Sequence, residues 1–452
     1  MEQIKENKMG VMPINKLLIS MSLPMMISML VQAMYNIVDS IFVAQLSENA
    51  LTAVSLAFPM QSLLIASATG TGVGVNSLLS RSLGQKDYKT VNKAATNGIF
   101  LWACWYVIFL IIGLTLTRPF YELQSSPAEI TELGVEYLTT ILICSFGIFM
   151  QMSFERLLQA TGRTVCTMIT QITGAVINII MDPILIFGLL GFPALGIKGA
   201  AIATVFGQIV AGIMAIIMNI KFNHEVHISF KGFRPSGRII KTILSIGIPS
   251  LLMQAVGSVM TVGMNKILIT FSSTAVAVFG VYFKLNSFIF MPIFGLNNGM
   301  VPIVAYNYGA GKRDRLVKTI KYSVIYAVAL MLIGIIIFEL IPGKLLLLFN
   351  ASDHMLDIGV PALRIICLSF AFAGVCIVLG SAFQALGNGM FSMIVSFTRQ
   401  IVILLPSAYL LSLTGNVDNV WWSYNIAEVA SLAGSLLFYV HMYKKVICKI
   451  GE

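Results

Sequence analysis

Six ionisable residues lie well inside long apolar stretches of the sequence, where the surroundings cannot solvate a charge. They are Asp39, Asp182, Lys266, Lys284, Arg399 and Glu428. A charge at such depth in a membrane is costly, so these side chains usually pair with one another or mark an ion or substrate path. Carboxylates can bind a cation or carry a proton, which makes the three acids the first candidates for chemistry.

Asp39 closes a polar stripe on one face of the first apolar stretch. Gln32, Tyr35 and Asn36 precede it by seven, four and three residues, spacings that place the four side chains on one face of an α-helix. Gln32, Tyr35 and Asn36 are therefore candidate substrate contacts. A buried carboxylate attracts a lipophilic cation and also takes up a proton or Na⁺, so we expect substrate and ion to exclude one another.

A second polar stripe contains Asp182. Gln171, Asn178 and Asp182 share a helix face at spacings of seven and four residues, and Pro183 follows at once. Proline cannot donate to the carbonyl of Ile179 and disfavours helical geometry at Asp182, so we expect a free backbone oxygen beside the side-chain oxygens. Carboxylate, amide and carbonyl oxygens suit Na⁺, and an intramembrane carboxylate also suits proton carriage. Gln171 is a further candidate substrate contact.

Glu428 is open to two interpretations. It shares a helix face with Trp421, Asn425 and Ser431, which fits a substrate contact. It can also pair with one of the three cations in the second half of the chain. A lone buried cation needs a partner, so ion pairing or helix packing is favoured for those cations over anion binding.

The composition is that of a membrane protein. Of 452 residues, 57% are hydrophobic and 11% charged, whereas soluble proteins carry about 25% charged residues. A helix needs roughly 20 apolar residues to cross a bilayer, and the strand alternation of a membrane barrel is missing. The sequence predicts an all-α membrane protein with twelve transmembrane helices, at about 15–45, 51–80, 94–116, 134–155, 164–190, 197–220, 242–271, 274–306, 319–341, 359–382, 391–411 and 418–442.

The second half of the chain repeats the first at one constant offset. That offset aligns Pro24 with Pro249, Gly70 with Gly295, Gly74 with Gly299, and the run 159–162 with 384–387. Two fused copies of a membrane bundle are a common way to build a transporter, with the substrate path between the copies. We expect a six-helix lobe over 1–220, a cytoplasmic connector over 221–241 and a second six-helix lobe over 242–452.

The net charge of +10 does not indicate nucleic-acid binding, because its distribution follows membrane topology. Of the 29 lysines and arginines, 22 lie in the two termini and in alternate loops. The positive-inside rule makes that side cytoplasmic, with both termini there. An even number of helices per half follows, so the two lobes insert in the same direction. We expect a multi-pass protein of a bacterial-type plasma membrane.

The sequence offers no catalytic or cofactor motif. The six cysteines have no metal-like spacing, and no Walker A sequence, Ser/His/Asp arrangement or catalytic carboxylate pair is present. A membrane-embedded transferase would need a nucleophile or an acid/base pair near an interface. We therefore expect a monomeric transporter rather than an enzyme, without a cofactor.

Four stretches carry a family resemblance. They are VDSIFV at 38–43, NIIMDPILIFG at 178–188, GAAIAT at 199–204 and AYNYGAG at 305–311. Together with the tandem repeat they resemble the multidrug and toxic compound extrusion (MATE) family, in its DinF-like and MepA-like branches. The resemblance covers essentially the whole chain, and the stretch at 178–188 is its most specific part.

The resemblance implies two six-helix lobes around a V-shaped central cavity. It also implies export of drug-like, often cationic molecules in exchange for Na⁺ or H⁺. Asp39, Asn178 and Asp182 match the family's cation site in the N-terminal lobe, with Thr204 as a fourth member. Some members carry acids in helices 7 and 10, and this sequence has none there, so we expect coupling in the N-terminal lobe, with Glu428 as the weaker alternative.

A second function fits the same superfamily. A lipid-linked oligosaccharide flippase would use Lys266, Lys284 and Arg399 as contacts to a pyrophosphate. The cluster of two acids and an amide in the N-terminal lobe favours the antiporter over the flippase.

Overall fold

The computed structural model describes residues 6–124, 127–349 and 351–450, and their regular elements are helices. Lys5, one of the predicted cytoplasmic cations, lies outside these ranges. The contacts within the chain define two compact units.

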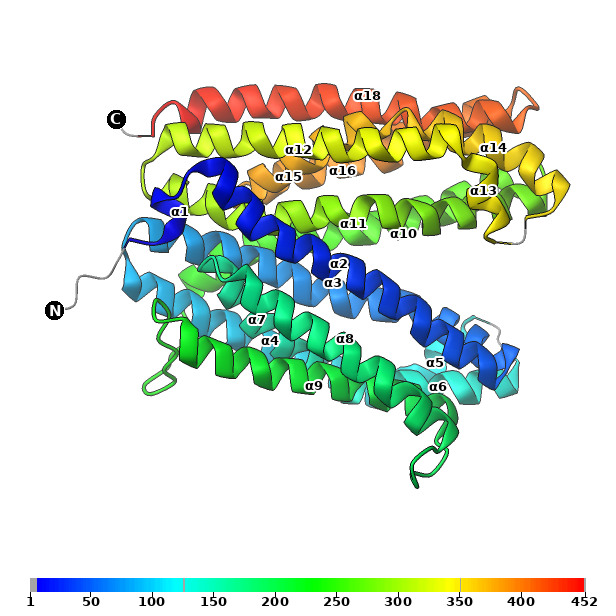
Figure 1. The fold of residues 1–452 in the computed structure, drawn as a ribbon, viewed down its shortest axis with the longest axis horizontal. Helices are drawn as coiled ribbons and strands as arrows, with labels where there is room; N and C mark the ends of the chain where they lie inside the picture. The colour runs from blue at the N-terminus through cyan, green and yellow to red at the C-terminus, as the bar shows by residue number, and fades with distance from the viewer. Residues whose placement is uncertain (1–5, 125–126, 350, 451–452) are drawn as a thin grey trace. The chain divides into compact units, whose positions relative to one another are not determined.

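One unit comprises Ile27–Leu251. Its helices lie largely side by side (Figure 1). They are the later part of α2 (Ile14–Leu46), α3 (Glu48–Gly84), α4 (Tyr88–Thr115), α5 (Thr117–Glu122), α6 (Ala128–Ile143), α7 (Phe146–Ala160), α8 (Thr164–Phe187), α9 (Gly196–Phe222) and the beginning of α10 (Gly237–Leu268).

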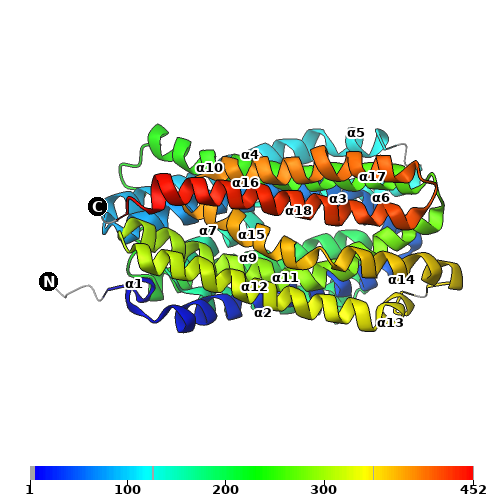
Figure 2. The same cartoon turned by 90° about the horizontal axis from the view of Figure 1, so that it is seen from above.

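The other unit comprises the chain up to Met26 and the chain from Leu252 onward. Within it, α18 runs alongside α16 and α17 (Figure 2). Besides the remaining parts of α2 and α10, its helices are α1 (Lys8–Val11), α11 (Ser273–Gly309), α12 (Arg313–Leu340), α13 (Pro342–Leu347), α14 (Asp353–Cys367), α15 (Phe370–Ala385), α16 (Gly389–Phe397), the π-helix η1 (Thr398–Leu404), α17 (Leu405–Ser412), α18 (Val417–Met442) and the π-helix η2 (Tyr443–Ile447).

The predicted all-helical membrane architecture is confirmed. Within the described ranges, ten helices are long and apolar enough to cross a membrane, and up to twelve spans result if each of two bent pairs counts as one. The pairs are α6 with α7, bent by 43°, and α14 with α15, bent by 49°. The predicted spans at 134–155 and 359–382 each correspond to one of these bent pairs, because the chain turns at Cys144–Ser145 and at Leu368–Ser369.

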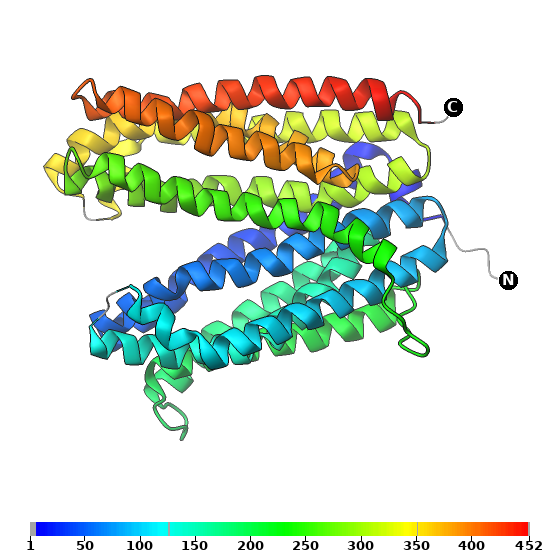
Figure 3. The ribbon, with the colours of Figure 1, turned by 180° about the vertical axis from the view of Figure 1, so that it is seen from behind.

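The boundary between the two units passes through α2 and α10, after Met26 and after Leu251. Each of these helices therefore belongs partly to one unit and partly to the other. The predicted lobes instead meet at the connector 221–241, whose non-helical part spans 223–236 (the green loop of Figure 3). The lobe boundaries at 220 and 242 stay a prediction.

The repeat is visible in matching helices. Helices α3 and α11 each have 37 residues, and their first residues, Glu48 and Ser273, are equivalent in the repeat. Each helix is capped by a serine, Ser47 or Ser272, whose Oγ accepts the backbone N–H three residues later at 3.0 Å. Lys86 and Gly311 follow the two helices at equivalent positions, and both have left-handed φ angles, of 59° and 69°.

Glycines at repeated positions allow each long helix to approach a neighbour closely. A Cβ at Gly70 of α3 would lie 2.7 Å from the carbonyl oxygen of Gly247 in α10. The equivalent Gly295 of α11 packs against the backbone of Met26 in α2, where a Cβ would lie 2.6 Å from the amide nitrogen. A larger side chain at either position would separate the helices, which explains why the repeat keeps glycine there.

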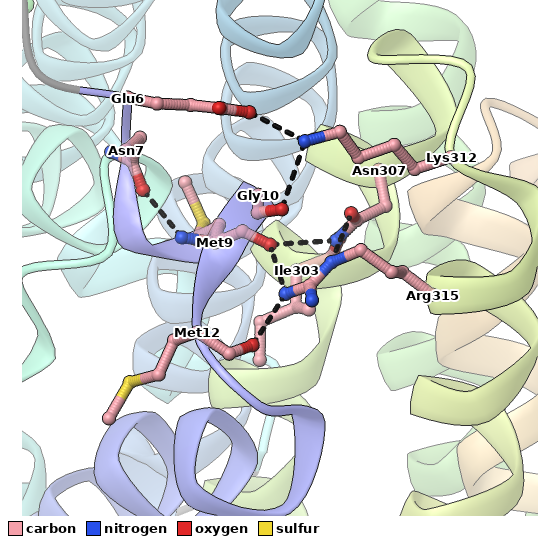
Figure 4. Close-up of polar contacts among 9 residues, drawn as sticks. All are labelled: Glu6, Asn7, Met9, Gly10, Met12, Ile303, Asn307, Lys312 and Arg315. Carbon is pink, nitrogen blue, oxygen red and sulfur yellow. Dashed lines mark hydrogen bonds and ion pairs between the residues drawn. The ribbon is translucent and has the colours of Figure 1, made fainter.

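The segment before α2 is held against α11 and α12 by polar contacts to its backbone (Figure 4). Arg315 Nη2 donates to the carbonyl oxygens of Met9 at 3.0 Å and Met12 at 2.7 Å. Asn307 Nδ2 donates to Met9 O at 3.0 Å, and Lys312 Nζ donates to Gly10 O at 2.9 Å. The Met9 side chain is fully buried, so polar and apolar contacts both fix this segment.

We expect Arg315→Ala to loosen the segment 6–12. Hydrogen bonds from a charged group contribute about 1.5–3 kcal/mol each, so the loss of two of them should raise amide exchange of the segment at least several-fold. Hydrogen–deuterium exchange with mass spectrometry measures this directly. Arg313→Ala is the matched control, because Arg313 donates to Tyr443 Oη and contacts Cys448 instead. Equal exchange in both variants would contradict the assignment.

Candidate ion-binding site

The site is built where α8 and α9 pack closely. A Cβ at Gly207 of α9 would lie 2.7 Å from the carbonyl oxygen of Gly174 in α8. At Gly199, a Cβ would lie 2.5 Å from the carbonyl oxygen of Leu185. Since α9 has glycine at both crossings and α8 has glycine at the first, the two backbones come close together and the polar side chains between them meet directly.

Asn178, Asp182 and Thr204 form one hydrogen-bonded group between these helices. The Asn178 side-chain amide has one orientation in which its nitrogen finds an acceptor and its oxygen finds donors. In that orientation Asn178 Nδ2 donates to Asp182 Oδ2 at 3.2 Å. Asn178 Oδ1 then accepts from Thr204 Oγ1 at 3.1 Å and from the Thr204 backbone N–H at 3.0 Å. The structure thus brings together the three residues that the sequence assigns to α8 and α9.

Asp39 joins this group from α2. Its carboxyl group makes a hydrogen-bonding contact with that of Asp182, which is fully buried. Asp39 Oδ1 and Asp182 Oδ1 have no hydrogen-bond partner within the described residues. Ionised carboxylates only accept hydrogen bonds, so two of them in contact need a proton or a bound cation between them. Two carboxyl groups placed in this way can hold an exchangeable cation between them.

The backbone at Pro183 differs from the prediction. Helix α8 continues through Asp182 and Pro183 to Phe187 and ends at Gly188, which has a left-handed φ of 73°. The expectation of non-helical geometry at Asp182 was wrong, because the packing of α8 against α9 outweighs the local preference against a helical residue before proline. Asp182 therefore presents its side chain from a regular helix.

The predicted substrate stripe lies beside the two acids. Tyr35 is half-buried and lies within electrostatic reach of both Asp39 and Asp182. Gln32 is half-buried and Asn36 exposed. Tyr137 of α6 also approaches Asp39 and accepts a hydrogen bond from Gln61 Nε2 at 3.0 Å; the sequence interpretation did not include it.

Gln171 leads to a buried acid that the sequence interpretation missed. Its Nε2 donates to Glu155 Oε2 at 2.8 Å, while Gln151 Nε2 and Thr170 Oγ1 donate to Glu155 Oε1 at 3.0 Å and 2.9 Å. Glu155 is only 2% exposed. The predicted fourth span ended at this residue, so the acid was not counted among the charges inside the apolar stretches. Gln151, four residues before Glu155 on the same helix, was the signal that could have identified it, whereas Thr170 and Gln171 come from α8.

Glu428 is paired with Arg399 in the other unit. Arg399 Nη1 donates to Glu428 Oε1 at 2.6 Å, and both side chains are largely buried. Of the two interpretations of Glu428, ion pairing is the one that the structure shows. Lys266 and Lys284 are exposed, and the Lys284 ammonium lies 5.9 Å from the centre of the Phe349 ring.

Among the described residues, no group of three or more His, Cys, Asp or Glu side chains gathers as a metal site. The candidate site instead combines two carboxyl groups with one amide and one hydroxyl. Such a neutral and anionic oxygen set suits Na⁺ or a proton better than a transition metal.

Comparison with known families identifies the chain. The MatE family model matches residues 24–184 and 249–410, two segments that begin at the equivalent prolines Pro24 and Pro249. The chain belongs to the MATE family. It is a transporter and not an enzyme. The two matched segments correspond to the two copies of the internal repeat.

Individual MATE relatives match over nearly their full length. The chain is 29% identical to the multidrug export protein MepA of Staphylococcus haemolyticus (strain JCSC1435), over 91% of this chain and 90% of that protein. It is 27% identical to MepA of Staphylococcus aureus (strain MRSA252), over 95% and 94%.

Solved MATE structures have the same fold. The outward-facing conformation of a multidrug resistance MATE transporter of the MOP superfamily matches with a TM-score of 0.92 at 27% identity, covering 98% of this chain and 99% of that one. A MOP superfamily transporter from Pyrococcus furiosus, for which the reverse polarity of the binding pocket suggests a different function, matches with a TM-score of 0.91 at 27% identity, covering 98% of this chain and 100% of that one.

Proposed function

We propose that this MATE transporter exports drug-like, mostly cationic and amphipathic molecules in exchange for Na⁺ or H⁺. The observation that carries the proposal is the contact between the Asp39 and Asp182 carboxyl groups, completed by Asn178 and Thr204. The naming of the staphylococcal relatives as multidrug export proteins supports the substrate class.

The chemistry of coupling follows from the acid pair. With a proton or Na⁺ between them, the two carboxyl groups are held together and their charge is reduced. Without it, the like charges repel, and the site attracts a cationic substrate. An ion that binds one state of the site better than the other shifts the transporter between states, which is what exchange requires.

The substrate contacts are assigned to the polar face of α2. Gln32, Tyr35 and Asn36 lie on the same helix as Asp39, so a lipophilic cation on this face lies beside the coupling acids. Gln171 and Glu428, the other two candidates, are engaged with Glu155 and Arg399 respectively. We therefore assign primary substrate contact to the α2 residues.

Efflux from proteoliposomes tests the proposal, with an imposed Na⁺ or H⁺ gradient applied one at a time. We expect one of the two gradients to drive efflux of a cationic dye, and the other to leave it at the passive rate. Efflux that responds to neither gradient would sink the antiporter assignment.

The flippase alternative is less well supported by the cations. Arg399, one of its three proposed pyrophosphate contacts, is already neutralised by Glu428. An anionic lipid would have to displace that carboxylate before it could bind. Stimulation of transport by an undecaprenyl-linked substrate, in the absence of any effect of cationic dyes, would favour the flippase.

We place the protein in a bacterial plasma membrane with both termini in the cytoplasm, as the Lys/Arg distribution predicts. In a background without native cysteines, Glu129→Cys and Lys231→Cys both create exposed thiols. An impermeant maleimide added to intact cells should label the thiol at 129, and the thiol at 231 only after the cells are opened. The opposite pattern would reverse the topology.

A further inference from the structure

One face of α18 carries a row of buried polar atoms. These are Trp421 Nε1, Tyr424 Oη, Glu428 Oε2, Ser431 Oγ and Ser435 Oγ, and none has a nitrogen or oxygen hydrogen-bond partner within the described residues. The spacings of three, four, three and four residues place all five on one side of the helix. Each residue is at most 7% exposed, and the row extends about 21 Å at 1.5 Å per residue.

Neighbouring helices face this row with further polar groups. The Cys376 thiol of α15 lies within weak hydrogen-bonding reach of the Ser431 and Ser435 hydroxyls. On α11, Tyr282 packs edge-to-face against Tyr424, with ring centres 5.7 Å apart. The polar groups therefore belong to three helices of one unit and not to a single irregular residue.

Packing does not explain so many unpartnered groups. Native proteins bond nearly all of their buried polar atoms, and those that lack a protein partner normally bond to internal water. Buried polar side chains that are satisfied occur on the same helix: Ser423 Oγ donates to Val420 O at 2.7 Å. The Ser423 and Ser431 hydroxyls therefore differ in hydrogen bonding because they lie on different faces of α18.

The Arg399–Glu428 pair lies at the middle of the row. Arg399 is in the π-helix η1, a geometry that recurs at functional sites. The offset of the repeat aligns Arg399 with Gly174 and Glu428 with Ala203, next to Thr204. This unit thus has a polar group in the same helix pair as the cation site of the other unit, but with a permanent guanidinium charge in place of an exchangeable cation.

The fixed charge of Arg399 determines which small molecule or ion can bind beside the polar row of α18. Glu428 is neutralised by Arg399, so it does not recruit a metal cation, while its free Oε2 accepts a hydrogen bond from a neutral donor. Trp421 and Tyr424 offer donors, and the Ser431 and Ser435 hydroxyls offer both a donor and acceptors. Water is the small molecule that satisfies donors and acceptors alike.

We infer that this face of α18 lines an internal water path, running from Trp421 to Ser435 and solvating the Arg399–Glu428 pair. The path lowers the cost of holding two charges inside a membrane-spanning bundle. The inference does not depend on which ion drives transport, because it concerns the unit that lacks the acid pair.

Hydroxyl-radical footprinting tests the path, because radicals generated from bound water oxidise the side chains beside it even when they are buried. The intact protein in lipid nanodiscs would be irradiated with short X-ray pulses and analysed by mass spectrometry. The controls are equally buried residues of the same type whose polar atoms are satisfied. Trp102 Nε1 donates to Ala68 O at 3.1 Å, and Tyr121 Oη donates to Ala53 O at 2.7 Å.

We expect Trp421 and Tyr424 to be oxidised several-fold faster than Trp102 and Tyr121. Equal rates within each matched pair would overturn the water path.

A second comparison uses Ser431→Val, which fills the path with an apolar group and should slow oxidation of Cys376 and Tyr424 several-fold. Ser423→Val places the same group on the satisfied side of α18 and should leave the rates unchanged. Equal effects of the two variants, both eluting as folded protein, would also overturn the inference.

Discussion

Asp182→Asn is expected to abolish gradient-driven efflux while leaving a folded, membrane-inserted protein. The amide has the same size as the carboxyl group and can still bond Asn178, but it can neither hold a proton for exchange nor neutralise Na⁺. Removal of a group that only positions the ligands of a bound ion typically costs about 10- to 100-fold in affinity or activity. Asp182 is itself one of the two charged groups of the site, so we expect its replacement to cost at least as much. We expect the same loss in Asp39→Asn.

The measurement is dye efflux from proteoliposomes under the gradient that drives the wild type. Asp357→Asn is the matched control, because Asp357 is exposed on α14 and lies outside the site. It should retain wild-type efflux. Thermal unfolding and gel filtration separate loss of coupling from loss of fold. Efflux at wild-type rates in either site variant would remove the acid pair from the coupling mechanism.

The architecture could be predicted because bilayer thickness imposes a length on every span. The predicted helices at 51–80 and 274–306 correspond to α3 and α11, and their common offset follows from a duplicated sequence. The breaks at Cys144–Ser145 and Leu368–Ser369 could not be predicted in this way. A broken span keeps its total apolar length, so hydropathy alone does not distinguish it from a continuous helix.

The sequence predicted those parts of the candidate site in which residues of a single helix share one face. Asn178 and Asp182 lie four residues apart, so helical geometry alone places them together. Contact of Asp182 with Asp39, and of Asn178 with Thr204, depends on tertiary packing through glycines such as Gly207, which spacing does not encode. For the same reason the sequence left several partners open for Glu428, and only the structure identifies its arginine partner.

The second large effect concerns competition between dye and ion. Binding of a cationic dye such as ethidium to the purified protein should weaken as pH falls or as Na⁺ rises, according to which ion drives transport. The ion enters between Asp39 and Asp182 and cancels the charge that attracts the dye to the stripe of Gln32, Tyr35 and Asn36. Coupling between two ligands of one protein is typically about 5- to 150-fold in affinity, and ligands that share one charged site should lie at the upper end.

Fluorescence titration of the dye at a series of pH values and Na⁺ concentrations measures this coupling. Asp39→Asn should bind dye more weakly and with an affinity that depends less on the ion, since one of the two carboxylates for which dye and ion compete is gone. Linkage requires that dye release the ion to the same extent, so a proton or Na⁺ release assay gives an independent value of the same coupling. An affinity for dye that is independent of both ions in the wild type would separate the substrate site from the ion site. Exchange would then have to proceed through two conformations with different affinities and without direct competition.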